Sequence, residues 1–199
     1  MLKTQMFAAT LRMTRSRTLF RALSGLSLIG LAIVLSSHGG SASSAAEFRY
    51  RDDCDPATFN AVIGPGACVG NGGTTFQKFN QELLEDKTVG AWRISPDQTG
   101  LDSGQPTLLV SRGGELHTFT RVENFGGGIV QPLNDAAGIK GVAPECQNLM
   151  GNPTAITADS RPVFPGSTVS GPGVPVGTTH FQCCIHPWMR TTVEVKSHH

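Results

Sequence analysis

One stretch near the end of the chain gathers side chains that bind soft metal ions. It reads "HFQCCIHPWM", residues 180–189, and places Cys183, His186 and Met189 three residues apart. Trigonal copper sites use such donors, namely two imidazoles, one thiolate and a weak axial thioether. We expect a strand that ends near Cys183, a tight turn at Pro187 and a second strand over "RTTVEVK". The loop between the strands can then point all three side chains at one ion.

Such a site lacks one histidine, which a distant strand has to supply. His117 in "RGGELHTFT" is the best candidate, because it begins a β-prone run after a Gly-Gly turn. His180 competes with it, but side chains alternate along a strand, so His180 and Cys183 are expected on opposite faces. Two other interpretations are a disulfide corner with a core methionine and a zinc site that also uses Cys184. The same alternation opposes the zinc site, since it turns Cys183 and Cys184 apart.

The sequence Cys183-x-x-His186-x-x-Met189 after a strand, with the upstream "GGELHTF" histidine, resembles the cupredoxin (blue copper) family. The short spacing and "HPWMR" are most similar to amicyanin, and more distantly to plastocyanin, over residues 90–196. The resemblance implies an all-β fold, a Greek-key β-sandwich that binds one type 1 copper ion and transfers single electrons. It also implies that the copper ligands are His117, Cys183, His186 and Met189.

The same resemblance implies where electrons enter and leave. In this family the edge of the C-terminal ligand histidine is the electron port, which is His186 here. Pro187 and Trp188 beside it imply an apolar patch on which an unknown redox partner docks. An exposed apolar patch is in itself typical of an interaction surface. We expect the protein to act as a monomer.

Five cysteines leave one without a disulfide partner. If Cys183 is the copper ligand, strand alternation turns Cys184 away from the ion and frees it for a disulfide. The other four cysteines allow three pairings. We favour Cys54–Cys68, which closes a short helical loop, together with Cys146–Cys184, which ties a long loop to the site.

Residues 1–46 are expected to be a secretory signal peptide. Five basic and no acidic residues precede the apolar run "LSGLSLIGLAIVLSS", and small residues lead to a cleavage position near Ala45 or Ala46. The run is short for a membrane-spanning helix, which needs about 20 residues, so membrane attachment requires an uncleaved leader. A cleaved leader predicts a periplasmic or secreted protein, where disulfides persist.

The charge of the mature chain argues against binding to nucleic acid. Of 16 basic residues 5 lie in the leader, whereas all 15 acidic residues follow it. The mature part therefore carries 11 basic and 15 acidic residues, a net charge of −4, which disfavours polyanionic partners. A low charged fraction of 16%, with 24 glycines and 12 prolines, is typical of a β-rich, loop-rich domain.

We expect the mature chain to have two parts. Residues 47–88 form a helical, disulfide-stapled extension, and residues 89–199 form the cupredoxin-like copper-binding domain. The first helix of the extension starts at Asp55 as N-cap, with Pro56 at its first position. The second is indicated by one apolar face with residues at i, i+3, i+7 and i+8. That face contains Phe76, Phe79, Leu83 and Leu84.

The rest of the chain alternates between short β-prone runs and turn-forming residues. The runs are "GAWRIS", "PTLLVSR", "LHTFTRV", "RPVF", "THFQCC" and "TTVEVK", and residues 126–165 are expected to be a long irregular loop. No catalytic triad or carboxylate pair stands out, and four protein ligands leave copper no open position, so enzyme activity is not expected. The alternative to electron transfer is a periplasmic copper-binding carrier or interaction module that holds the ion without redox cycling.

Overall fold

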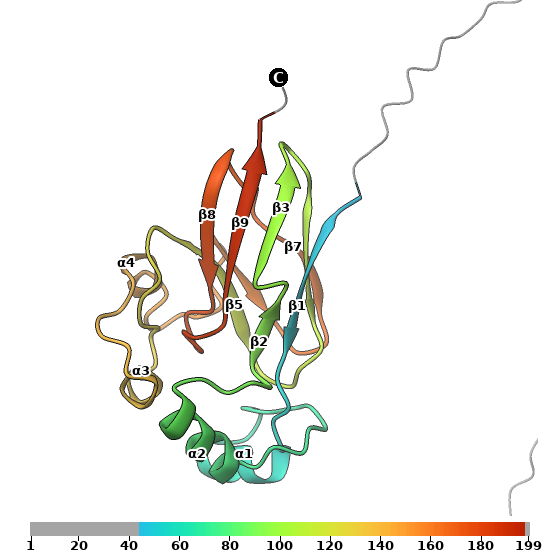
Figure 1. Ribbon diagram of the computed structural model, residues 1–199. Coiled ribbons are helices and arrows are strands. Elements are labelled where there is room, and N and C mark those ends of the chain that lie inside the picture. The colour runs from blue at the N-terminus through green and yellow to red at the C-terminus, as the bar shows by residue number, and fades with distance from the viewer. Residues whose placement is uncertain (1–43, 198–199) are drawn as a thin grey trace, which may run out of the picture. The chain divides into compact units, whose positions relative to one another are not determined.

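The computed structural model of the protein describes residues 44–197, and all but the last three residues of the predicted signal peptide lie outside this range. The described residues form a sandwich of two β-sheets (Figure 1). In spatial order, the first sheet contains β2 (Arg93–Ser95), β1 (Ala46–Arg51), β4 (Thr107–Ser111) and β7 (Thr168–Ser170). The second contains β3 (Gln98–Asp102), β9 (Arg190–Lys196), β8 (Gly177–Gln182), β5 (His117–Val122) and β6 (Ser160–Val163).

The connectivity agrees with the predicted all-β sandwich. Most consecutive strands lie in different sheets, which is the crossed connectivity of a Greek-key sandwich. Strand β1 runs parallel to β4, and β3 runs parallel to β9, so both sheets are mixed. Each of the six predicted β-prone runs overlaps a strand, whereas β1, β3 and β7 were not predicted.

Aromatic side chains fill the space between the sheets. The rings of Phe119 on β5 and Phe181 on β8 stack with centroids 4.1 Å apart. Phe48 on β1 meets Phe119 from the opposite sheet at 5.1 Å. All three are fully buried, and full burial of a phenylalanine stabilises a fold by about 1.5–3 kcal/mol. The prediction that residues 47–88 form only a helical extension is therefore wrong for β1, which is part of the core.

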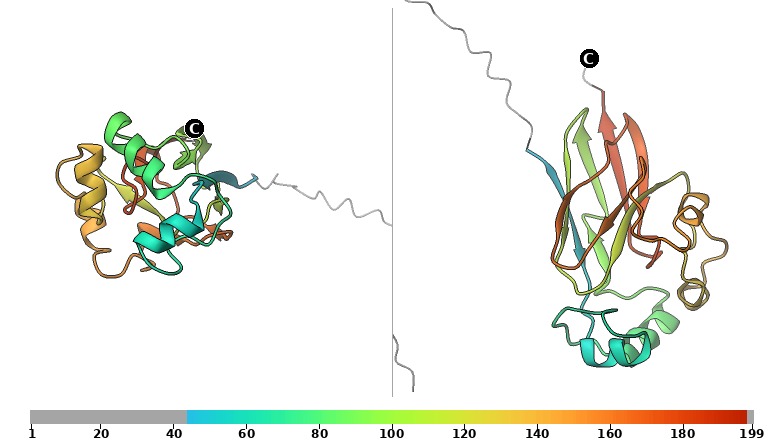
Figure 2. Two further views of the ribbon diagram at one scale, coloured as in Figure 1. Left: turned by 90° about the horizontal axis from the view of Figure 1, so that it is seen from below. Right: turned by 180° about the vertical axis from the view of Figure 1, so that it is seen from behind.

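Two helices form a cap at one end of the sandwich (Figures 1 and 2). We call residues 53–92 the helical cap; it contains α1 (Pro56–Val62) and α2 (Phe76–Asp86). As predicted, α1 is capped by the Asp55 carboxylate, which accepts hydrogen bonds from the N–H groups of residues 57 and 58. The predicted apolar face of α2 is only partly buried: Leu83 is fully buried, but Leu84 at the next position is 51% exposed.

The segment that was expected to be one irregular loop contains two short helices, α3 (Gln131–Ala137) and α4 (Pro144–Gln147). Both lie beside the sandwich (Figure 1). Cys146 in α4 forms a disulfide with Cys184, and Cys54 forms one with Cys68, so both favoured pairings are confirmed. None of the helices within residues 44–197 is long and apolar enough to cross a membrane.

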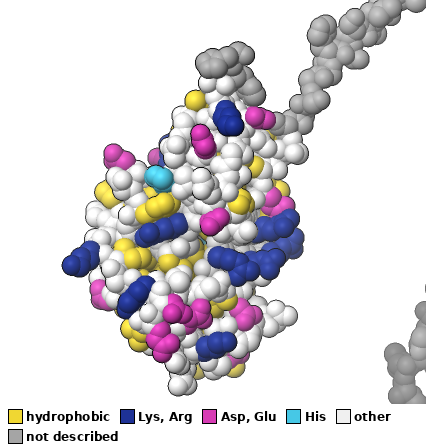
Figure 3. All heavy atoms as spheres, in the orientation of Figure 1, with side chains coloured by type: hydrophobic (Ala, Val, Ile, Leu, Met, Phe, Trp, Pro, Cys, Tyr) yellow, Lys and Arg dark blue, Asp and Glu magenta, His cyan; other side chains and the backbone are white. Residues whose placement is uncertain are grey.

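Basic side chains gather over β1 and β2 (Figure 3). Arg51 and Arg93 are direct partners in the antiparallel pair of these strands, and both are exposed. With Arg112 they line a shallow hollow of about 200 Å³ that also includes Asp52. Like charges directly opposite each other destabilise a strand pair.

Arg93→Glu is therefore expected to raise the free energy of unfolding by about 0.2–1 kcal/mol at low salt, because it turns a like-charge pair into an opposite-charge pair. The gain should shrink at high salt, where exposed charges are screened. Urea unfolding followed by tryptophan fluorescence measures it. Arg93→Gln, which only removes a charge, is the control, and a Glu variant no more stable than the Gln variant contradicts the explanation.

Candidate metal centre

Three of the four predicted ligands converge at one end of the second sheet. His117 is the first residue of β5, Cys183 follows the last residue of β8, and His186 lies in the turn before β9. The Cys183 Sγ atom lies 3.9 Å from His117 Nδ1 and 4.0 Å from His186 Nδ1. The three candidate ligand atoms all lie within 4.8 Å of one another. His117 and Cys183 are fully buried, and His186 is 4% exposed.

The turn between β8 and β9 holds its side chains through backbone hydrogen bonds. The Cys183 N–H donates to the Met189 carbonyl, and the Met189 N–H donates to the His186 carbonyl; the N···O distance is 2.9 Å in both hydrogen bonds. Met189 is 1% exposed, and its role as the fourth ligand stays a prediction. His180, in contrast, lies 3.3 Å from the Thr192 hydroxyl and packs on Phe125. The structure therefore agrees with a structural role for His180.

The environment of Cys183 favours a thiolate. The backbone N–H groups of Thr118 and His186 both donate to its sulfur, with N···Sγ distances of 3.4 Å. Burial by itself would raise the pKa of the Cys183 thiol, but hydrogen bonds and positive charge from His117 and His186 outweigh burial and hold the pKa well below its usual value. A thiolate is the form of cysteine that binds metal ions.

A buried carboxylate holds the first histidine. The Nε2 atom of His117 lies 2.8 Å from Asp52 Oδ2, and both side chains are fully buried. The N–H groups of Gly114 and Glu115 also donate to the Asp52 carboxylate, over 2.7 and 3.2 Å. Burial opposes the charge of His117, but Asp52 and the Cys183 thiolate outweigh it and raise the pKa of His117 to about 9.

A second carboxylate faces the other histidine. Glu115 Oε2 lies 3.5 Å from His186 Nε2 and accepts a hydrogen bond of 2.5 Å from the indole N–H of Trp92. Burial raises the pKa of Glu115, although His186 and the Trp92 hydrogen bond oppose that rise. Each imidazole thus points Nδ1 toward Cys183 and Nε2 toward a carboxylate. Carboxylates in this position fix the orientation of ligand histidines and increase their basicity.

The sequence analysis missed both carboxylates. Asp52 is 65 residues away from His117 along the chain, and it lies in the segment that was predicted to be a helical extension. Glu115 lies two residues before His117, and on a strand that spacing would place the two side chains on the same face. That spacing was the available signal for Glu115, and no comparable local signal marks Asp52.

The donor set fits copper better than zinc. Two imidazole nitrogens and one thiolate form the trigonal set typical of type 1 copper. A structural zinc site needs four protein ligands, and the thiol considered as its further ligand, Cys184, is tied to Cys146. Among the described residues, Cys183 remains as the free cysteine.

Comparison with known proteins gives matches at the level of the fold. No protein-family description and no curated protein sequence matches the chain. Among solved structures, a purple cupredoxin from Nitrosopumilus maritimus is 12% identical, with 76% of this chain and 99% of that chain covered and a TM-score of 0.39. An amicyanin variant in the Cu(I) form is 16% identical, with 52% of this chain and 73% of that chain covered and a TM-score of 0.32. A fern plastocyanin variant is 19% identical, with 53% of this chain and 89% of that chain covered and a TM-score of 0.32. The two-sheet arrangement of the strands agrees with the β-sandwich that the sequence analysis expected.

The expected electron port at His186 lies under other residues. The resemblance implied an exposed apolar patch around Pro187 and Trp188, but Pro187 is buried and Trp188 is only partly exposed. The ring of Phe79 in the helical cap lies 6.0 Å from Trp188, which in turn lies 5.6 Å from His186. The helical cap thus covers the side of His186 that was expected to face solvent.

Proposed function

We propose that the protein is an exported type 1 copper protein that carries single electrons between redox partners. The observation that carries this proposal is the buried convergence of His117, Cys183 and His186. These three residues, together with the neighbouring Met189, would hold the copper ion. Copper supplies one-electron exchange, and a trigonal donor set serves both of its oxidation states with little rearrangement.

The residues of the chain prepare the site before any ion binds. Cys183 provides the thiolate, stabilised by two backbone N–H groups. Asp52 and Glu115 hold the imidazoles with Nδ1 directed inward. Burial of all three ligands keeps water away from the sulfur. A site that is pre-arranged in this way needs little reorganisation when charge changes, which suits electron transfer rather than substrate chemistry. We therefore propose no enzyme activity.

The compartment and the alternative function follow from the same features. Two disulfides support an oxidising compartment, the periplasm or the exterior. A copper carrier that delivers its ion without redox cycling is the second candidate. Full burial of Cys183 and the carboxylates behind both histidines favour retention of the ion over release.

The redox partner is proposed to dock near Trp188. Its ring lies 5.6 Å from that of His186 and is partly exposed, whereas Pro187 is buried. Of the two residues near which docking was expected, we therefore propose the partly exposed Trp188 as the contact for the partner. Interface centres are enriched in aromatic residues such as tryptophan.

The visible absorption spectrum tests the proposed function. With one equivalent of Cu(II), the protein is expected to show an intense thiolate-to-copper band that ascorbate bleaches and oxidant restores. Cys183→Ser should lose the band, because a hydroxyl cannot replace the thiolate. His180→Gln is the matched control: it changes a histidine on β8 outside the ligand set and should keep the band.

Two results contradict the proposal. A faint copper band that is the same in Cys183→Ser means that Cys183 is not a ligand. A strong band that cannot be cycled with ascorbate and oxidant, combined with transfer of copper to a competing chelator, favours the carrier function instead.

A further inference from the structure

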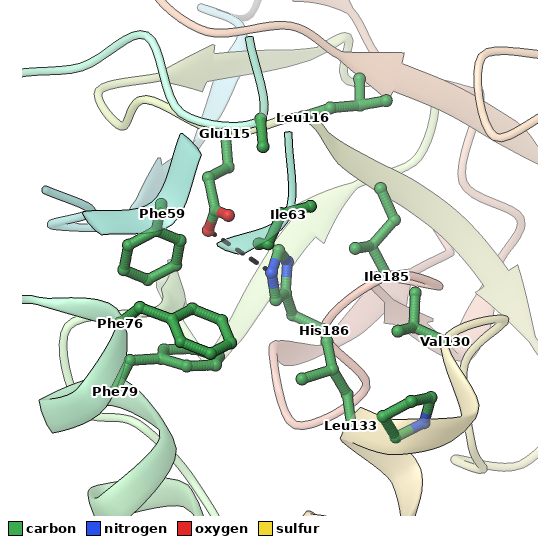
Figure 4. Close-up of a pocket in the computed structure, with 12 residues that line it drawn as sticks. Phe59, Ile63, Phe76, Phe79, Glu115, Leu116, Val130, Leu133, Ile185 and His186 are labelled. Carbon is green, nitrogen blue, oxygen red and sulfur yellow. Dashed lines mark ion pairs between the residues drawn. The ribbon is translucent and has the colours of Figure 1, made fainter. Parts of the chain in front are cut away.

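A pocket of about 350 Å³ lies directly beside His186, between the helical cap and the start of α3 (Figure 4). Phe59, Phe76 and Phe79 line it from the cap, and Val130 and Leu133 line it from the segment around α3. Figure 4 shows these two groups on opposite sides of the His186 ring. The pocket is thus built from segments far apart in the sequence, and it lies against one side of the candidate metal centre.

Two polar side chains line the pocket, Glu115 and His186. Glu115 is 6% exposed. Its Oε2 atom accepts the Trp92 hydrogen bond and faces His186. Its Oε1 atom accepts no hydrogen bond from any residue in the range 44–197. Because Oε1 keeps some solvent access, a ligand that brings a hydrogen-bond donor into the pocket can take the place of water on this oxygen.

The walls select the rest of the ligand. The Phe59 ring meets those of Phe76 and Phe79 edge to face, with centroids 5.3 and 5.5 Å apart. An aromatic molecule can join such a cluster with similar geometry, and aromatic pairs gain stability beyond their buried area. The volume is at the lower end for small-molecule pockets, which are mostly apolar with a few placed polar groups. A charged ligand is disfavoured, since the apolar walls cannot solvate it.

We propose that this pocket binds a small aromatic alcohol. Its ring packs among Phe59, Phe76 and Phe79, and its hydroxyl donates a hydrogen bond to Glu115. A bound molecule of this kind lies against the His186 ring, next to the proposed metal centre. The binding itself does not depend on copper, so its success or failure is separate from that of the proposed function.

Binding of phenol and toluene to the metal-free, full-length exported protein tests the proposal, with ¹H–¹⁵N NMR titration as the readout. The two probes have nearly the same shape but differ in the hydroxyl. Both should shift the amides of Leu116 and Ile185 saturably, with phenol about tenfold tighter or more. Glu115→Gln should reduce this preference to about threefold, because hydrogen bonds to charged groups are roughly twice as strong as neutral ones.

Two surface variants separate the pocket from unspecific binding. Ile63 lines the pocket and is 56% exposed, so Ile63→Trp should fill the mouth without disturbing the core and weaken both probes at least about tenfold. Val62→Trp is the matched control, since Val62 is 62% exposed and does not line this pocket. The proposal is overturned if neither probe saturates, if toluene binds as tightly as phenol, or if Ile63→Trp binds like Val62→Trp.

Discussion

Asp52→Leu is expected to lower the free energy of unfolding of the metal-free protein by about 3–5 kcal/mol. Removing one partner of a buried ion pair leaves the other charge uncompensated, which typically costs about 3–5 kcal/mol. Here the substitution leaves His117 Nε2 and the N–H groups of Gly114 and Glu115 without their acceptor. Urea or thermal unfolding followed by circular dichroism measures the change.

Asp52→Asn is the matched control, because it keeps the size of the side chain and one acceptor oxygen but removes the charge. The free energy of unfolding of Asp52→Asn should lie between that of the wild type and that of Asp52→Leu. In copper-loaded samples it should also raise the reduction potential, since a negative charge beside His117 stabilises the oxidised, more positive ion. A leucine variant as stable as the asparagine variant contradicts the assigned role of Asp52.

The difference in stability between wild type and Asp52→Asn should depend on pH. The pKa of His117 is raised from 6.5 to about 9, so its pairing with Asp52 stabilises fully below pH 6.5 and is lost as the pH rises through about 9. Burial opposes ionisation of Asp52, but His117 and two backbone N–H groups hold its pKa below 3.8, so this stabilisation is also lost in stronger acid. Between these limits the difference should be largest. Titration of Cys183 occurs in both proteins and largely cancels in the difference.

The convergence of His117, Cys183 and His186 could be predicted because most of the information for it is local. Cys183, His186 and Met189 lie on one short loop, and the spacing alone limits what they can bind. Alternation of side chains in the chain that continues from β8 also explains why Cys184 faces away from Cys183 and reaches Cys146. His117 was found only because it begins a β-prone run. These predictions depend on the geometry of one strand and one turn, which the sequence specifies directly.

Other features depend on tertiary contacts that no local pattern specifies. Asp52 meets His117 because β1 enters the core beside β4, and β1 itself carries the missed alternation of Phe48 and Tyr50 with exposed residues. Strand β3 shows almost no alternation, with Leu101 as its one buried residue, and its pairing with β9 decides its conformation. The sequence predicts α2 as an amphipathic helix, but its position over His186 could not be predicted from its own apolar face.

Removal of the Cys146–Cys184 disulfide is the second large effect we expect. Cys146→Ala combined with Cys184→Ala should lower the free energy of unfolding by about 4 kcal/mol, because the bridge closes a loop with a sequence separation of 38. The matched pair, Cys54→Ala with Cys68→Ala, opens a separation of 14 and should cost about 3 kcal/mol. Substituting both cysteines of each bridge avoids a stray thiol beside the site.

The two disulfide variants should differ more in their local effect than in overall stability. The Ile129 N–H donates to the Cys184 carbonyl over 2.7 Å, and a Cβ atom on Gly128 would lie 2.2 Å from the same oxygen, so the chain before α3 packs directly on Cys184. Loss of the Cys146–Cys184 bridge should speed amide hydrogen exchange across α3 and α4 and weaken phenol binding, because Val130 and Leu133 wall the pocket. Loss of the other bridge should speed exchange in α1 instead. If amide hydrogen exchange in α3 is equally fast in the two disulfide variants, the backbone contacts of Cys184, rather than its disulfide, hold this segment against the metal centre.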